Sequence, residues 1–410
     1  EHSADAGAVT RLEAFLDSLG GPARRSSRAD RARAASGGFV RERGAVARRR
    51  VLVPPMCDHS RALVAAFRHC GLESAVLPEA DAASLAAARR HLSGKECYPC
   101  AVTSAHMLGA ARAQEFAAAA RLDWQRAESG RGRWRLFGAM GVDGTGPCRF
   151  GLYGALQRRV LDAAGLGEAA LFSPVQGKRF YQEAGIAGAR YSRRAWEGVV
   201  CFDLLAKCLH EYRPGEKQPG AADALYAAWA DRLEAHLSDG GGGLPQMVAA
   251  MCEDFAANPR DAGARDDEPR PLVGVVGEIF VRSSRFSNEE LIRRIEALGG
   301  RAWLAPIDEW ILYVGHMARR RAWQDRDAGA LLKLWIERRV QHRTAHALEA
   351  AAARRLYNAR EAGTAEILDL AAPYLRDTFQ GEAVLTVGKA VDMLRRGARG
   401  IVNAIPFGCM

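Results

Sequence analysis

Short apolar runs alternate with helical patterns along most of this 410-residue chain, and this alternation limits its possible folds more than any other feature. The apolar runs predict strands at residues 51–54, 74–78, 134–140, 169–172, 271–279, 301–304 and 400–404. Apolar positions at three- and four-residue spacing predict helices between them, at residues 60–70, 81–91, 101–121, 150–164, 287–298 and 383–396. Because strand, helix and strand in succession favour parallel pairing, the chain is expected to form mostly parallel sheets flanked by helices.

Two long segments, residues 194–260 and 310–372, have helical patterns without an intervening strand. A polar, charged segment at residues 261–270 separates the two alternating halves. The chain is longer than one hydrophobic core usually supports. We therefore expect a first α/β domain with a helical extension at residues 51–260 and a second with a helical insertion at residues 271–410. In the second domain, Ser287 is expected to cap the helix 287–298.

Residues 1–50 are expected to contain a short amphipathic helix, Val9–Ser18, and then a basic flexible linker at residues 21–50. Ten arginines lie between Arg24 and Arg50 against Asp30 and Glu42, a surplus of +8 in a chain whose net charge is +10. The rest of the chain therefore carries only +2. Because the basic excess is confined to one Arg-, Ala-, Gly- and Ser-rich tract, we expect a linker and no nucleic-acid partner.

No apolar run approaches the roughly 18 residues that span a bilayer, and the start of the chain lacks a basic-then-apolar signal pattern. We therefore expect a cytoplasmic protein without a membrane partner. Nine cysteines, odd in number and unevenly spaced, are more typical of reduced thiols and metal ligands than of a disulfide framework. Since residue 1 is not Met and the last residue directly follows a cysteine motif, the chain is expected to be a segment of a longer polypeptide.

Four cysteines have surroundings that suit a metal ligand. Cys97 and Cys100 form a CxxC pair just before a predicted helix, where backbone N–H groups favour thiolate over thiol. Cys148 and Cys409 each lie in a loop rich in Gly and Pro after a predicted strand. Because the carboxyl ends of parallel strands meet at one edge of a sheet, we expect these four thiols to converge between the domains.

Four thiolates can hold an iron–sulfur cluster or a zinc ion, and a redox dithiol or inert thiols also fit the pattern. Two isolated cysteines far from the CxxC pair favour iron–sulfur over structural zinc. Cys57 follows the first strand, and the sequence leaves open whether Cys57 or Cys100 is a ligand. His59 is expected to be a hydrogen-bonded loop residue. The cysteines inside apolar helices are expected to be small buried hydrophobes: Cys70, Cys201, Cys208 and Cys252.

Five stretches carry a family resemblance: SGKECYPC at 93–100, GPCRFG at 146–151, VGEIFVR at 276–282 followed by FSN at 286–288, GEAVLTVGK at 381–389 and GIVN at 400–403. Together, in this order, they resemble the acyl-CoA dehydratase activase-related proteins. Relatives of that family are the 2-hydroxyacyl-CoA dehydratase subunits and the double-cubane-cluster proteins. The resemblance covers roughly residues 51–410 of the chain.

The resemblance implies two Rossmann- or flavodoxin-like domains around an oxygen-sensitive iron–sulfur cluster, of the 4Fe-4S or double-cubane type, in an anaerobic setting. It implies that the cluster accepts low-potential electrons from an ATP-dependent activase domain or subunit. The electrons would pass to an acyl-CoA or another small substrate. Residues expected to orient the substrate or the surroundings of the cluster are Glu278, Arg282, Asn288 and Arg149. Equally, Glu278 and Arg282 could form an interdomain ion pair, with Asn288 in the first turn of a helix.

No nucleotide-binding loop of the GxxxxGK type is present, so this segment is expected to bind no nucleotide itself. Two alternatives to an electron-transfer function stay open. The first is a non-catalytic cluster scaffold that binds an activase or dehydratase partner, and the second is a zinc-stabilised structural module. Whether the chain is a subunit or domain of a reductive or dehydratase-type enzyme, which substrate it takes and how it oligomerises are not fixed by the sequence.

Deleting the basic tract, residues 21–50, is expected to leave folding and iron content unchanged. The reason is that the tract carries most of the excess charge and shows no apolar periodicity. Circular dichroism and iron analysis of the truncated and full chains provide the comparison. A large loss of iron on truncation would show that the tract is structural.

Overall fold

The computed structural model describes residues 50–112, 134–137, 149–166, 170–172, 188–259, 270–406 and 409. All of them belong to one unit, Val40–Met410. This unit is mixed α/β and mostly helical, with small parallel sheets. The expected combination of helices and parallel strands is therefore confirmed.

Four parallel strands in the order β2-β1-β3-β4 form the first sheet of the described residues: β1 Arg50–Val53, β2 Ser74–Val76, β3 Trp134–Phe137 and β4 Ala170–Phe172. In β1, Leu52 is paired with Ala75 on one side and Leu136 on the other. Val51, Leu52 and Val53 are all buried, which explains why this strand is a continuous apolar run. Because the strands are parallel, their carboxyl ends lie at one edge.

The helices of this half are α3 His59–His69, α4 Ala82–Arg89, α5 Tyr98–Arg112, the 3-10 turn η1 Arg149–Leu152 and α7 Tyr153–Ala163. Their starts follow from local chemistry. At α4, the Asp81 carboxylate accepts from the Ser84 N–H at 2.7 Å, and the Ser84 hydroxyl accepts from the Asp81 N–H at 2.9 Å. This reciprocal capping satisfies two backbone donors at the helix start.

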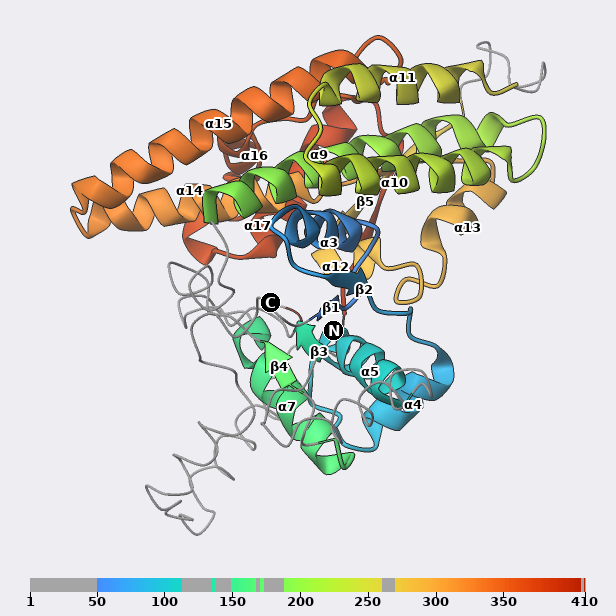
Figure 1. Ribbon diagram of the computed structural model, residues 1–410. Coiled ribbons are helices and arrows are strands. Elements are labelled where there is room, and N and C mark those ends of the chain that lie inside the picture. The colour runs from blue at the N-terminus through green and yellow to red at the C-terminus, as the bar shows by residue number, and fades with distance from the viewer. Residues whose placement is uncertain are drawn as a thin grey trace, which may run out of the picture. The chain divides into compact units, whose positions relative to one another are not determined.

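Helices α9 Gly188–Tyr212, α10 Ala221–Asp239, α11 Leu244–Ala257 and α15 Ala328–Ala352 pack together into a helical layer (Figure 1). Phe202 and Leu205 of α9, Leu233 of α10 and Phe255 of α11 belong to its fully buried core. Helix α9 also packs against α3 and against β6 of the second sheet. It therefore joins the strand-bearing parts of the two halves.

Three parallel strands in the order β6-β5-β7 form the second sheet: β5 Leu272–Gly277, β6 Arg301–Leu304 and β7 Gly400–Ala404. Gly274 of β5 is paired with Trp303 and with Ile401. The helices of this half are α12 Ile279–Ser283, α13 Leu291–Ala297, α14 Asp308–Gln324, α16 Thr364–Ala371 and α17 Glu382–Arg395. The expected helical insertion thus corresponds to α14, α15 and α16.

Several predicted boundaries are wrong. Helix α5 begins at Tyr98, inside the CxxC motif, and strand β5 ends at Gly277 rather than residue 279. Ser287 does not cap a helix, because α13 begins only at Leu291 and the Leu291 N–H donates to the Asn288 side chain at 3.1 Å. Strand β1 already includes Arg50, so a deletion of the basic tract has to stop at residue 49.

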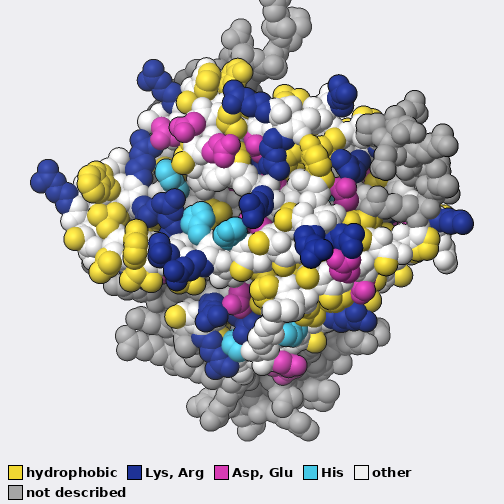
Figure 2. Space-filling model, turned by 90° about the horizontal axis from the view of Figure 1, so that it is seen from above, with side chains coloured by type: hydrophobic (Ala, Val, Ile, Leu, Met, Phe, Trp, Pro, Cys, Tyr) yellow, Lys and Arg dark blue, Asp and Glu magenta, His cyan; other side chains and the backbone are white. Residues whose placement is uncertain are grey.

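Two further expectations, the helix Val9–Ser18 and helical residues 113–121, lie outside the described residues. No described helix combines the length and the apolar character needed to cross a bilayer. Figure 2 shows hydrophobic side chains gathered at one end of the helical layer, on the left, where α14 and α15 meet. The exposed large side chains of these two helices are Trp323, Leu332, Trp335, Ile336 and Val340.

Gly388→Ala is expected to lower the free energy of unfolding by about 1–3 kcal/mol, a typical cost of overpacking. A Cβ at Gly388 of α17 would lie 2.1 Å from the backbone oxygen of Ile367 in α16, and backbone cannot easily move away. Gly315→Ala in α14 is the matched control, since its Cβ would meet nothing closer than 3.8 Å. Denaturant titration should show Gly315→Ala at or above wild-type stability, and equal losses in both variants would contradict the packing argument.

Candidate functional site

The carboxyl ends of the parallel strands carry the polar and thiol side chains of interest. Cys57 follows β1, Glu278 directly follows β5, and Cys409 follows β7. The ends of β5 and β7 are held very close, because Gly277 has a φ of +121° and a Cβ there would lie 2.2 Å from the Ala404 oxygen. The Glu278 N–H donates to that same oxygen at 3.0 Å. Only glycine permits this approach, so Gly277 fixes the position of Glu278.

The CxxC pair lies at the N-terminus of α5. Cys97 immediately precedes the helix and is half-buried, whereas Cys100 is in the first turn and completely buried. The loop before it is closed by Glu96, whose carboxylate accepts from the Ser93 N–H at 3.0 Å and the Ser93 hydroxyl at 2.8 Å. Both cysteines therefore lie at the positive end of the helix dipole, Cys97 in the preceding loop and Cys100 in the first turn.

Tyr153, the first residue of α7, joins this pair to the second half of the chain. Its hydroxyl is hydrogen-bonded to Cys97, and Cys100 and Glu278 also lie within electrostatic range. Burial raises the pKa of Tyr153 far above its ordinary value, and the neighbouring thiols and carboxyl raise it further. The structure thus brings together groups from α5, α7 and the end of β5, which are distant in sequence.

Glu278, which lies within electrostatic range of Tyr153, has a second carboxyl group near it, that of Glu382, and both have raised pKa values. Burial raises the pKa of Glu278, although its carboxylate caps α12 by accepting from the Phe280 N–H at 3.0 Å and the Val281 N–H at 2.8 Å. Burial, together with the charge of Glu278, raises the pKa of Glu382 to about 8. Two like charges cannot both be accommodated there, so the pair is expected to keep a proton at neutral pH.

The other residues predicted to orient the substrate have structural contacts. Arg282 is buried and donates to the Gly277 oxygen at 2.9 Å and the Pro306 oxygen at 3.1 Å, which ties the ends of β5 and β6 together. The Asn288 amide donates to the Arg282 oxygen at 3.0 Å. Arg149 begins η1, but its side chain lies outside the described residues.

The four predicted ligands are only partly described. Cys148 lies outside the described residues, and Cys409 is half-buried in a turn in which its N–H donates to the Pro406 oxygen at 3.1 Å. Within the described part of the chain, which omits Cys148, no three His, Cys, Asp or Glu side chains group closely enough to hold a metal ion. Cys97, Cys100 and Cys409 all have interaction partners. The convergence of the four thiols therefore stays a prediction.

The predictions for the remaining cysteines agree with the structure only in part. Cys201, Cys208 and Cys252 are completely buried as expected, and the sulfurs of Cys208 and Cys252 lie 3.6 Å apart. The prediction that Cys70 is a buried residue inside a helix is wrong, because Cys70 is the partly exposed C-cap of α3. His59 is not a loop residue but the buried first residue of α3, hydrogen-bonded to both Cys57 and Asp203.

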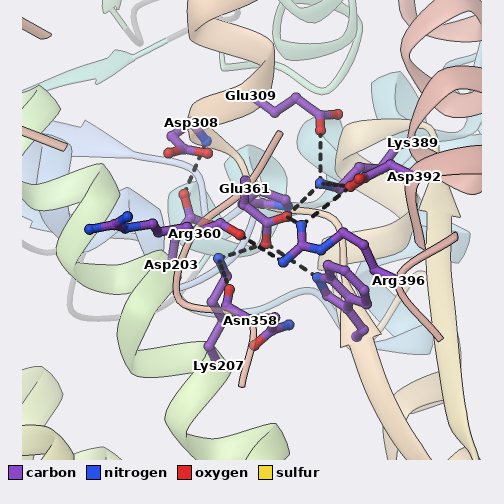
Figure 3. A network of polar contacts seen from close by, with 12 residues as sticks. Asp203, Lys207, Asp308, Glu309, Asn358, Arg360, Glu361, Lys389, Asp392 and Arg396 are labelled. Atoms are coloured by element: carbon purple, nitrogen blue, oxygen red, sulfur yellow. Dashed lines mark hydrogen bonds and ion pairs between the residues drawn. The ribbon is translucent and has the colours of Figure 1, made fainter. Parts of the chain in front are cut away.

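A buried ionic network links α9, α14, α17 and the segment that carries Glu361 (Figure 3). Lys389, which is 1% exposed, pairs with Glu361 and Asp392 and lies 3.5 Å from Glu309. Burial alone would raise the pKa of Glu361, but Lys207 and Lys389 outweigh it and hold that pKa at about 2. Because each charge has a partner of opposite sign, this network is a structural tie between α9, α17 and the segment carrying Glu361.

No family model, curated protein or solved structure matches this chain in comparisons with known proteins. Sequence reasoning missed Tyr153 and Glu382 as members of the site, although both belong to stretches that it singled out or bordered. Glu382 is the second residue of the GEAVLTVGK stretch, and Tyr153 lies two residues after GPCRFG. It missed Asp203 entirely, since nothing near that position distinguishes it from any acidic residue on a helix.

Glu382→Gln is expected to flatten the pH dependence of stability between about pH 5 and pH 8. With a folded pKa of about 8 against an ordinary 4.5, Glu382 holds a proton in the folded state that the unfolded chain releases. The stability linked to this proton is present below about pH 4.5 and is lost as the pH rises through about 8.

Denaturant titrations across this range measure the effect. Glu366→Gln, in the first turn of the neighbouring α16 and exposed, is the matched control and should keep the wild-type slope. A wild-type slope in Glu382→Gln would show that Glu382 is ionised in the folded protein.

Proposed function

We propose that this chain is a cytoplasmic iron–sulfur protein. In this proposal a 4Fe-4S or double-cubane cluster is held by four thiolates, those of Cys97, Cys100, Cys148 and Cys409. The protein receives low-potential electrons from an ATP-dependent activase and passes them to a small substrate such as an acyl-CoA. The observation that carries the proposal is the meeting of Cys97 and Cys100 with Tyr153 and Glu278, at the carboxyl edge of the second sheet.

The order of the strands supports this location. The first sheet runs β2-β1-β3-β4 and the second β6-β5-β7, so each begins with the 2-1-3 order of flavodoxin-like folds. In such folds ligands bind where the strand order reverses, which is between β1 and β3 and between β5 and β7. Glu278 and Cys409 follow β5 and β7, and the chain that leads to Cys148 follows β3. Two of the three predicted ligand loops, those of Cys148 and Cys409, thus follow strands at these reversal points, and in our proposal Cys97 and Cys100 approach from the start of α5.

The donor groups that the structure describes fit such a cluster. Cys97 and Cys100 supply soft sulfur ligands at a helix N-terminus, where the dipole favours thiolate. The Tyr153 hydroxyl, which is hydrogen-bonded to Cys97, can donate to that sulfur, and hydrogen bonds to ligand sulfurs tune the reduction potential. Complete burial of Cys100 fits either a solvent-shielded ligand or a core residue.

The neighbouring acids suit a reductive reaction. A bound cluster supplies one-electron reduction at this edge of the sheet. Glu278 and Glu382 have raised pKa values and can hold a proton between them at neutral pH, within electrostatic range of Tyr153 through Glu278. A proton donor of this kind can neutralise charge that develops on a reduced substrate. Arg282, which ties the ends of β5 and β6, keeps Glu278 and its helix cap in place.

Two alternatives share the same thiols. A non-catalytic scaffold would bind the cluster and an activase or dehydratase partner without turning over substrate, and a zinc module would use the four thiolates for stability alone. Turnover with an activase, ATP and a strong reductant separates the enzyme from the scaffold. Metal analysis separates both from the zinc module.

Anaerobically purified full-length chain is expected to contain iron and sulfide and to absorb broadly in the visible range. Cys148→Ser and Cys409→Ser should lower the iron content most, because each is the single anchor from its loop. Cys97→Ser should lower it as well, and Cys100→Ser tests the least certain ligand. Iron analysis and the visible spectrum of each variant are the measurements.

Cys70→Ala and Cys208→Ala are the controls and should keep the full iron content. Cys208→Ala removes a buried group, so a small loss of stability is expected there without loss of iron. A colourless protein with bound zinc would contradict the proposal and favour the zinc module. Full iron content in both Cys148→Ser and Cys409→Ser would contradict the ligand set.

A further inference from the structure

Cys57, His59 and Asp203 form a line of hydrogen-bonded groups that the iron–sulfur proposal does not use. The Cys57 sulfur lies 3.2 Å from Nδ1 of His59, and Nε2 of the same ring lies 3.0 Å from the Asp203 carboxylate. The imidazole therefore lies between the thiol and the carboxylate. This arrangement suits proton transfer along the line rather than chelation, since the two outer groups bind opposite sides of the ring.

The carboxylate at the end of this line is held in place by backbone. Asp203 is buried in α9 and accepts from the Ile307 N–H at 2.9 Å and the Asp308 N–H at 3.0 Å, both at the start of α14. With these bonds and the one from His59, its oxygens have three donors. Asp203 can therefore fix the ring orientation and stabilise a protonated imidazole.

The thiol lies just before the start of a helix. Cys57 precedes α3, whose first residue is His59, so the backbone dipole of α3 points its positive end toward the sulfur. Burial alone would lower the pKa of His59, but the charges of Cys57 and Asp203 outweigh it and raise that pKa well above the ordinary value. The contacts are those of a thiol within hydrogen-bond reach of an imidazole that a buried carboxylate holds on its other side.

Cys57 and His59 open onto a cavity of about 80 Å³. That volume is several times the roughly 10–15 Å³ that one water needs on this measure. Two buried polar atoms in its wall have no hydrogen-bond partner within the described part of the chain: Nε of Arg282 and the hydroxyl of Ser283. Arg282 is only 4% exposed, so its unpartnered N–H is an independent sign that the cavity takes a polar ligand.

The charges that face the cavity favour an anion. The basic side chains come from α9, the 3-10 turn η2 Arg213–Gly215, α12, the loop after α12, and α13. They are Lys207, Arg213, Arg282, Arg285 and Arg293. The acidic ones are Asp58, Asp203 and Glu290, and Tyr226 of α10 donates to Asp58. Burial and neighbouring arginines lower the pKa of His210 to about 3, so this lining histidine adds no charge. Five basic groups stand against three acidic ones, and four of the five are also paired with a carboxylate: Lys207, Arg213, Arg285 and Arg293. Arg282 donates to two backbone oxygens instead, so the positive charge left for a ligand is centred on Arg282.

We propose that Cys57 is a nucleophilic thiolate with His59 as its acid–base partner and Asp203 as the positioning residue, and that the cavity admits a small anionic acyl donor. In the reaction, the Cys57 sulfur forms a bond to the acyl carbonyl carbon and the bond from that carbon to the leaving group breaks. The leaving group takes the proton of the His59 imidazolium, which leaves neutral His59 and S-acylated Cys57. No oxidant, reductant or metal is needed, so the proposal is independent of the iron–sulfur function.

The chain contains an internal control for the reactivity of Cys57. Cys70 lies at the other end of the same helix, is also partly exposed, and has a pKa that burial raises. With iodoacetamide at about pH 6, peptide mass spectrometry of the full chain should show Cys57 alkylated at least about tenfold faster than Cys70. Equal alkylation rates at the two cysteines, or faster alkylation of Cys70, would overturn the proposal that Cys57 is a reactive thiolate.

Asp203→Asn tests the positioning residue. It should shift the pH midpoint of Cys57 alkylation upward, because an amide cannot stabilise the imidazolium, while leaving Cys70 unchanged. Asp254→Asn, which replaces an exposed carboxylate on α11, is the matched control and should leave both midpoints unchanged. If Asp203→Asn does not fold, His59→Gln makes the same test at the ring itself. An unchanged pH midpoint of Cys57 alkylation in the folded variant would overturn the proposed role of His59 and Asp203 in activating Cys57.

The anion preference is tested by comparing iodoacetate with iodoacetamide, which differ in charge but share a leaving group. The ratio of the two rates should be higher at Cys57 than at Cys70, and Arg285→Gln should lower it at Cys57 alone. Acyl transfer is tested with 4-nitrophenyl acetate, which should acetylate the Cys57 peptide in wild type and not in Cys57→Ser. Equal ratios at both cysteines would overturn the anionic ligand, and acetylation only at other residues would overturn the acyl transfer.

Discussion

The buried carboxylate of Asp203 is the interaction on which the arrangement of the two halves depends. From the middle of α9 it accepts hydrogen bonds from His59 at the start of α3 and from two N–H groups at the start of α14. Those helices begin just after the carboxyl ends of β1 and β6. A buried carboxylate without such donors would cost several kcal/mol, so these helix starts and α9 have to meet in one place. The edges that carry the thiols are thereby held in a fixed relation.

The buried acids of the second half differ in the direction of their pKa shifts, because they have different neighbours. Glu361 is buried between Lys207 and Lys389, which outweigh the cost of burial and keep it ionised. Glu278 and Glu382 are buried near each other, and the charge of Arg282 does not outweigh burial, so their pKa values rise. The second half of the chain thus holds buried acids that stay charged as well as buried acids with raised pKa values. The difference depends on the placement of two lysines and not on the type of acid.

Local patterns in the sequence predict most of the strands and helices. They do not predict which side chains of distant elements come into contact. Strand β7 at Gly400–Ala404 has the predicted bounds, because an apolar run between a turn and a proline has few other possibilities. The cap at Ser287 was wrong because the backbone turns once more before α13, with Glu289 and Glu290 at positive φ. His59 and Asp203 are 144 positions apart, and the partners of a buried histidine cannot be inferred from its neighbours. Tyr153 could not be predicted as a site residue for the same reason, because what marks it is its contact with Cys97 and its closeness to Glu278, both distant in sequence.

Two cysteine sites in this chain share one local design and differ in their partners. Cys57 and Cys97 both precede a helix, so both sulfurs lie at the positive end of a helix dipole. Beside Cys57 stands an imidazole backed by a carboxylate, which can accept and return a proton while the sulfur forms a covalent bond. Beside Cys97 lies the Tyr153 hydroxyl, which is in turn within electrostatic range of the buried acid Glu278, and a further thiol, Cys100, lies three positions on. The first environment suits the proposed nucleophile and the second the proposed sulfur ligand. Because the helix start is common to both sites, the tertiary partners are what distinguish them.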